Sequence, residues 1–324
     1  MVGKASISRL RTRIDAEPLA ELVRRCCRSL ADARLHPQAF YAGRRLVTLD
    51  GSCFELPDEA DNATTFGYPG SRTSVSGHAV YPQARCVVLV ECATHAILGA
   101  NVGPYASGEW TLGAKLRPRL GPGMLCLADR GFNGYEHWRL ASATGAVSLW
   151  RCSDTRQLPV LRMFDDISFI SSISPSVSGA KRAAEQAITV RVIEYTRPGH
   201  AQAQPRDRLL TTLLAAKAAP ALKLAELYHQ RWEVECVFDE LKTYLRQGRR
   251  VLRSKLPELL RQEFYGWVLA HYAVRWLLHQ GAARDRQPHA ELSFKGRVEL
   301  LRRSQPQSGA VPSRAPHMRE TMAS

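Results

Sequence analysis

The stretch "GMLCLAD" (residues 123–129) constrains the possible folds most strongly. It is a short continuous apolar run between a glycine and an aspartate, which is typical of a strand buried on both faces of a sheet. Burying both faces requires further layers of structure on each side. The run therefore predicts an α/β fold in which helices flank a sheet.

Other segments supply the rest of such a sheet and its helices. The stretch "RRLVTLDGSCFELPD" predicts a strand, a turn at Asp50-Gly51 and a second strand. Residues 61–78, "DNATTFGYPGSRTSVSGH", are rich in Gly, Ser and Thr and predict a loop. We expect further strands at residues 84–93, 95–103 and 146–152, and helices at 16–31, 108–120, 135–145, 221–247 and 256–282.

The order of these patterns divides the chain into five regions. We expect a partial helical region at 1–45, the first part of the core at 46–152 and its helical remainder at 213–303. Between the two core parts, residues 153–212 contain short strand patterns and read as a β-rich insertion or the far edge of the sheet. The tail at 304–324 lacks periodicity and predicts disorder.

Charge and composition restrict the function classes. With 45 Lys and Arg against 30 Asp and Glu, the net charge is +15, which favours a polyanionic partner such as nucleic acid. The eight cysteines form no C-x-x-C pair and favour free thiols. No apolar run is long enough to cross a bilayer, and the N-terminus lacks the apolar core of a secretory signal. We expect a cytoplasmic protein without a membrane partner.

Two predicted strands end in aspartates. Asp50 closes "RRLVTLD" and Asp129 closes "MLCLAD". Taken singly, Asp50 has a structural explanation as a turn residue and Asp129 as a cap. Together with a third carboxylate on a later helix, Glu235, they make a donor set suited to Mg²⁺ ions, which prefer oxygen ligands and support phosphoryl transfer.

The helix that carries Glu235 has a polar stripe. In "YHQRWEVECVFDELK", Tyr228, Arg231, Glu235 and Lys242 fall within roughly 60° of one another on an α-helix, at about 100° per residue. Arg231 and Lys242 would contact phosphates, and Tyr228 would stack on a base or bind a phosphate. The alternative is a set of ion pairs on a solvated helix face, where Glu235 would be an ordinary surface acid.

The spacing of this stripe resembles the signature of bacterial DDE transposases of the insertion-sequence-4 family. "LVTLDGSCFELPD" and "LADRGFNGYE" are similar to the segments that carry the family's two catalytic aspartates, in the same order. The resemblance extends over roughly residues 16–303 and includes "FGYPGS" and "RQEFYGWVLAHYAVRWL".

The resemblance implies an RNase H-like core with a β-rich insertion before the helix bearing the last carboxylate. It implies that Asp50, Asp129 and Glu235 are catalytic and bind two Mg²⁺ ions, with Mn²⁺ as a substitute. It also implies that Tyr228, Arg231 and Lys242 bind double-stranded transposon-end DNA. The implied activity is metal-dependent cleavage at the element's ends and strand transfer into target DNA by a homodimer.

Two further interpretations stay open at the level of sequence. Relatives carry an additional N-terminal helical domain, and here the resemblance begins close to residue 1, so we expect a truncated copy. Such a copy would be a transposase, a non-catalytic DNA-binding remnant, or a plain RNase H-like nuclease. Metal-dependent nicking separates the remnant from the enzymes, and strand transfer separates the two enzymes.

Overall fold

The computed structural model describes residues 10–69, 81–175, 186–195, 207–246, 250–285 and 293–304. Its centre is one ten-stranded sheet with the strand order β4-β3-β2-β5-β6-β10-β9-β8-β7, and the short β1 pairs with β2. The strands are β1 (Phe40–Tyr41), β2 (Arg44–Glu55), β3 (Gln83–Glu91), β4 (Ile97–Pro104), β5 (Met124–Ala128), β6 (Val147–Cys152), β7 (Arg162–Met163), β8 (Ser168–Ile173), β9 (Ile188–Tyr195) and β10 (Asp207–Thr211).

The first five long strands have the topology of an RNase H-like core. Strands β2, β3 and β4 form an antiparallel meander, and β5 and β6 then add in parallel on the other side of β2. The predicted apolar run is β5, with β2 and β6 on either side, and four of its five residues are buried. The predicted α/β fold class with this core is confirmed.

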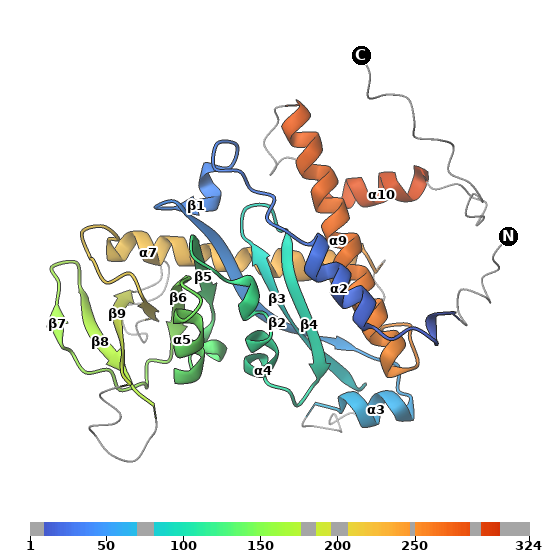
Figure 1. Ribbon diagram of the computed structural model, residues 1–324, viewed down its shortest axis with the longest axis horizontal. Coiled ribbons are helices and arrows are strands. Elements are labelled where there is room, and N and C mark those ends of the chain that lie inside the picture. The colour runs from blue at the N-terminus through green and yellow to red at the C-terminus, as the bar shows by residue number, and fades with distance from the viewer. Residues whose placement is uncertain are drawn as a thin grey trace.

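The β-rich insertion extends this sheet. Strand β10 pairs antiparallel with β6, and β9, β8 and β7 follow outward (Figure 1). The buried Arg191 of β9 joins the insertion to the next helix, since its guanidinium donates to Asp166 and to the carbonyl of Ala219. The strand-rich stretch is thus both an insertion and the far edge of the sheet.

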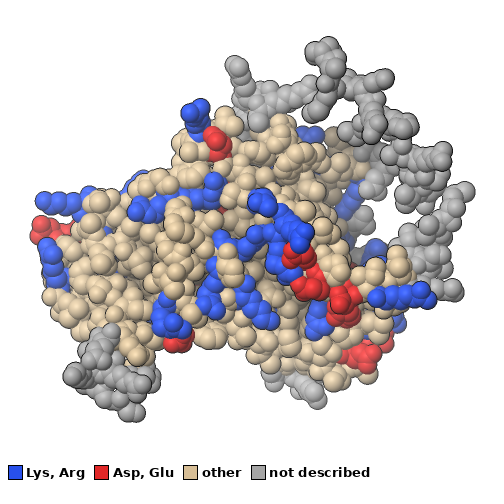
Figure 2. Space-filling model, viewed as in Figure 1, with Lys and Arg blue, Asp and Glu red and all other residues tan. Residues whose placement is uncertain are grey.

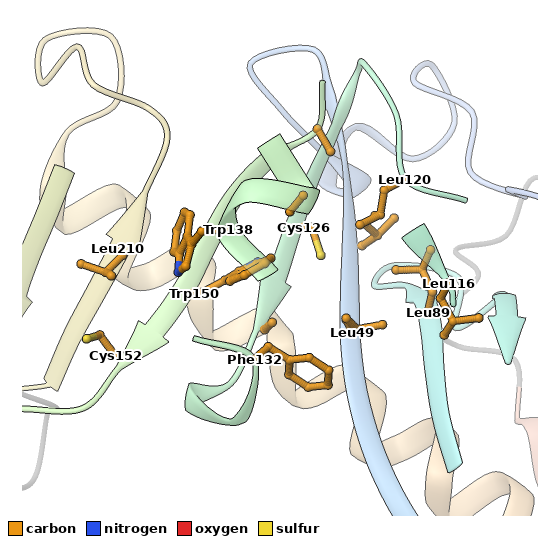
Figure 3. Close-up of a cluster of buried hydrophobic side chains, with 14 of the residues drawn as sticks. Leu49, Leu89, Leu116, Leu120, Cys126, Phe132, Trp138, Trp150, Cys152 and Leu210 are labelled. Atoms are coloured by element: carbon orange, nitrogen blue, oxygen red, sulfur yellow. The ribbon is translucent and has the colours of Figure 1, made fainter. Parts of the chain in front are cut away.

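Helices cover both faces of the sheet. In Figure 1, α4 (Glu109–Ala114) and α5 (Tyr135–Ser142) lie in front and α7 (Ala221–Tyr228) lies behind. The front layer buries Leu49, Phe132, Trp138 and Trp150 in one core, as Figure 3 shows. The back layer is completed by α8 (Glu233–Asp239) and α9 (Pro257–Asp285), whose apolar residues pack on β2, β3 and β4. Further helices in the described residues are α2 (Glu17–Cys26), α3 (Ala60–Phe66) and α10 (Phe294–Ser304).

Several sequence predictions were wrong in detail. Strand β2 runs straight through Asp50-Gly51 without a bend, because Gly51 pairs with Val87 in the ladder. Residues 61–66 of the predicted loop belong to α3, while its residues 70–78 lie outside the described residues. The first predicted helix ends at Cys26 rather than at residue 31. The predicted disordered tail lies outside the described residues except for Ser304, the last residue of α10.

The helix predicted over 221–247 is four segments rather than one. After α7, residues His229–Trp232 form the 3-10 helix η4, and after α8, residues Glu240–Tyr244 form the π-helical segment η5. Both changes of pitch rotate the side chains away from the positions of a regular α-helix. The single narrow stripe computed from 100° per residue is therefore not the observed arrangement.

Candidate active site

Asp50 and Asp129 lie next to each other because their strands are parallel and in register. Leu49 of β2 pairs with Ala128 of β5, so the following residues, the two aspartates, continue that register. Both fall on the sheet face that also carries Leu46 and Leu125, which pack toward α7. The predicted proximity of the two carboxylates is therefore present, although Asp50 lies inside β2 rather than at its end.

Arg231 neutralises one of these carboxylates. Its Nη1 donates to Asp50 Oδ2 at 2.7 Å, and both side chains are mostly buried. Burial raises the pKa of Asp50 to about 6, the neighbouring Arg231 opposes this rise, and the carboxylates of Glu109 and Asp129 add to it. The site thus favours more positive charge than Arg231 alone supplies.

Asp129 offers an oxygen without a donor. Its Oδ1 is buried and has no hydrogen-bond partner among the described residues. A buried carboxylate oxygen left without a donor is costly unless a cation or water occupies the space beside it. The aspartate pair therefore fits the oxygen ligands of a divalent metal ion.

Glu235 is not part of that pair. It is exposed on α8 and lines a pocket of about 790 Å³ that also includes Glu233, Asp239 and Arg275. In the described part of the chain, no three Asp, Glu, His or Cys side chains lie close enough together to hold a metal ion. The structure brings together two of the three predicted ligands.

The other acids of this helix are already engaged. Glu233 contacts His95 at 2.7 Å, Asp239 accepts a hydrogen bond from Thr243, and the buried Glu240 contacts His271 and Arg275. Among the described residues, no hydrogen bond or ion pair is made by Glu235. Its carboxylate is the one on α8 that is available to a ligand.

The predicted DNA-binding residues differ in exposure. Lys242 donates to Ser52 Oγ at 2.6 Å, two residues beyond Asp50 on β2. Tyr228 is only 4% exposed, and its hydroxyl donates to the carbonyl of Ala128 at 3.3 Å. In this arrangement, Tyr228 supports the end of β5 just before Asp129 and offers DNA no surface.

Glu109, at the first turn of α4, is a residue that the sequence analysis missed. A Cβ on Gly51 would lie 2.5 Å from Glu109 Cγ, and one on Gly131 would lie 3.2 Å from its Oε2. Gly51 follows Asp50 by one residue, and Gly131 follows Asp129 by two. The sequence analysis assigns Gly51 to a turn, but both glycines leave space for the Glu109 carboxylate, which also lies 3.8 Å from Arg85 Nη1.

None of the helices in the described part of the chain combines the length and apolar character needed to span a bilayer. All eight cysteines are free, as their spacing predicts.

Comparisons with known proteins find similarity to transposases. The chain is 26% identical to the transposase InsG for insertion sequence element IS4 of Escherichia coli K12, over the whole chain and 72% of that protein. It is 24% identical to the putative transposase InsZ of the same organism, over 41% of the chain and 43% of that protein. A chain in the cryo-EM structure of the piggyBac transposase synaptic complex with hairpin DNA is also similar. That match has a TM-score of 0.47 and 10% identity, and it covers 82% of this chain and 55% of the other. The transposase DDE domain family matches residues 41–273, well over half of the sequence, and the chain belongs to that family.

Proposed function

We propose that the chain cleaves double-stranded DNA at the ends of an insertion sequence and transfers the freed strand into target DNA. The observation that supports this most directly is the register of Asp50 and Asp129, with a buried oxygen of Asp129 left without a donor. Together with family membership, this pair favours metal-assisted phosphoryl transfer over simple DNA binding. Because its substrate would be genomic DNA, we place the protein in the cytoplasm at the nucleoid.

In this proposal Asp50, Asp129 and Glu235 hold two Mg²⁺ ions, with Mn²⁺ as a substitute. The metals would activate the attacking water or 3′-hydroxyl and stabilise the leaving oxygen. Glu235 is available for this role because its carboxylate has no other described partner, but it must move toward the aspartates from its present place on α8. Glu109 is an alternative third ligand, because its carboxylate is close enough to act electrostatically on Asp50.

The cations of the helix would position the DNA strand. Arg231 holds the Asp50 carboxylate in the protein alone, and its guanidinium has the fork geometry that phosphates require. Lys242 lies beside Ser52, where a phosphate next to the scissile bond would pass. Tyr228 would act by supporting the end of β5, and binding of both transposon ends would require a homodimer.

The test uses DNA that carries the inverted repeats flanking the gene. Wild-type protein should nick this DNA only with Mg²⁺ or Mn²⁺ and should join pre-cleaved ends to a target. Asp129→Asn should lower the nicking rate at least 100-fold while DNA affinity stays within about threefold, since one ligand is lost. Asp154→Asn, at an exposed site in the insertion, is the matched control and should retain activity. Nicking without joined product would identify a plain nuclease.

A second candidate function follows from the position of Glu235. Because the described residues contain no complete three-ligand group, the chain would alternatively bind DNA without cutting it and act as a regulator of intact relatives. Glu235→Gln separates the two functions. An equal loss of metal-dependent nicking in Glu235→Gln and Asp129→Asn supports the transposase, whereas metal-independent DNA binding without any cleavage supports the regulator.

A further inference from the structure

A row of cations follows strand β2 away from the aspartate pair. Alternate residues of this strand face the back layer, and each meets a cation in turn. Arg231 pairs with Asp50 and Lys242 with Ser52, and the Arg246 guanidinium lies 5.6 Å from the centre of the Phe54 ring. From Asp50 to Phe54 the strand advances about 13 Å, which is close to the axial rise of four nucleotides of one DNA strand.

The row ends in a polar pocket of about 390 Å³, here called the arginine pocket. Five parts of the chain meet there, and the lining residues are Arg11, Leu245, Arg246, Val251, Arg253, Ser254, Glu263, Trp267 and Arg302. The segment at 250–254 is fixed to the end of β2, because Val251 bridges to Glu55 and the Leu252 N–H donates to the Glu55 carbonyl at 3.0 Å. The pocket is therefore continuous with the strand that carries Asp50.

The arginine pocket carries an excess of positive charge. Four arginines line it against one carboxylate, Glu263, and that carboxylate already accepts the backbone N–H groups of Arg253 and Ser254. Arg302 donates to the carbonyls of Tyr244 and Leu245 and so is held at the pocket by neutral groups. Glu263 is the one carboxylate in the described lining, so the lining keeps a formal excess of three positive charges, which favours binding of an anion.

Arg246 shows this most clearly. The residue is 7% exposed and lies between the rings of Phe54 and Trp267, and its Nη2 donates to the carbonyl of Arg250. Its Nε is buried without an acceptor among the described residues. Glu263 and Glu55 act on Arg246 electrostatically, but no described carboxylate is hydrogen-bonded to it. A buried guanidinium with an unused N–H is unfavourable unless an external acceptor completes it.

We propose that the arginine pocket binds a phosphate of the DNA strand whose scissile bond lies at the aspartate pair. The assignment of DNA as the source of that phosphate depends on the proposed function. The pocket itself depends only on the arginines, and free inorganic phosphate would meet the same chemistry. DNA is favoured because the cation row is continuous from Asp50 to the pocket.

The experiment compares Arg253→Ala with Arg139→Ala. Arg253 is on the exposed rim of the pocket, so its loss leaves the core intact, whereas Arg139 is an exposed arginine of α5 on the opposite face of the sheet. Each variant removes one positive charge. If one phosphate contact is lost, the slope of log affinity against log salt should become shallower by about 0.9 in Arg253→Ala only, and affinity at low salt should fall several-fold.

A second measurement uses inorganic phosphate and the melting temperature of each protein. Stabilisation by phosphate in wild type that is absent in Arg253→Ala, together with the shallower salt slope, supports the proposal. If phosphate stabilises wild type and Arg139→Ala but not Arg253→Ala, while the two variants have equal salt slopes, the pocket holds a free anion. That result would overturn the assignment to DNA. Equal behaviour of the two variants in both measurements would overturn the pocket altogether. If wild type binds no DNA, the proposed function fails, and the phosphate measurement alone decides the pocket.

Discussion

At the scale of single residues, the glycine after Asp50 has a steric role. A glycine in the interior of a strand is unfavourable unless something needs the space that a side chain would fill. Here the Glu109 side chain occupies that space, on the sheet face opposite to the one that carries the Asp50 side chain. The Asp-Gly pair, which is a frequent turn signal, gives no indication in sequence that the glycine instead accommodates a distant acid.

Gly51→Ala should therefore destabilise the protein by about 1–3 kcal/mol, because its Cβ would overlap the Glu109 side chain. The measurement is urea unfolding. Adding Glu109→Ala should restore most of the loss, since the clash disappears. Gly121→Ala is the control, because a Cβ there meets nothing within 4 Å. If the double variant is as unstable as Gly51→Ala alone, the contact with Glu109 is not the cause.

His137 provides a pH-dependent contribution to stability. It is 5% exposed and packs against Trp110 and Phe132, and burial, with Arg117 nearby, lowers its pKa to about 4. The unfolded chain, with a His pKa near 6.5, binds the proton more tightly than the folded chain. The stabilising contribution of His137 is therefore complete above about pH 6.5 and is lost as the pH falls toward 4.

Between pH 7 and pH 5, this residue alone should lower the free energy of unfolding by about 2 kcal/mol. His137→Leu, which cannot be protonated, should reduce the difference in stability between these two pH values by that amount. Urea unfolding of both proteins at pH 7 and pH 5 measures it. An unchanged difference would show that His137 already carries its proton in the folded protein.

At the scale of elements, strands were easier to predict than the turns and the helix that join them. The apolar runs of β3 and β5 required no tertiary knowledge, because continuous burial leaves a direct trace in composition. The segmented helix from α7 to η5 leaves no such trace. Its π segment lets Glu240 reach Arg275 while Lys242 reaches Ser52, and both contacts join residues far apart in the sequence.

The turn between β7 and β8 is another element whose conformation is set by its context. Ile167 adopts a φ of +62° there, which a β-branched side chain disfavours, and it is 67% exposed. Ile167→Asn should stabilise the protein by about 1 kcal/mol, because Asn tolerates the left-handed region. Thermal unfolding measures the gain. Ile167→Val, which stays β-branched, should give none, and a gain of equal size in Val would assign the effect to side-chain size.

At the scale of the whole molecule, the candidate site was predictable only where it follows from strand register. Asp50 lies within β2, and Asp129 directly follows the neighbouring parallel strand β5. Their proximity therefore follows from the fold class. Glu235 and Tyr228 depend on how a late helix packs, and the structure places one outside the pair and buries the other. Glu109 comes from a third element, and no pattern connects it to the aspartates.

The net charge of +15 predicts a polyanionic partner but does not locate it. Figure 2 shows basic side chains gathered on the face that carries α2 and α4, opposite the layer with α8. Part of that charge is balanced locally, because Arg24 and Arg25 of α2 pair with Glu17 and Glu21. Either the overall field or the specific cation row could dominate DNA affinity, and the two give different results.

Removing two charges from each place distinguishes them. The double variant Lys242→Ala/Arg253→Ala removes one charge from the cation row and one from the arginine pocket. The double variant Arg24→Ala/Arg25→Ala changes α2 by the same net charge. If the row and pocket neutralise about four phosphates, wild-type DNA affinity should fall about 100-fold between 50 and 200 mM salt. The first double variant should lose about half of that slope, while the second keeps it, because only the row contacts phosphates. Equal losses in both variants would assign DNA binding to net charge, and a flat wild-type response would contradict phosphate binding along β2.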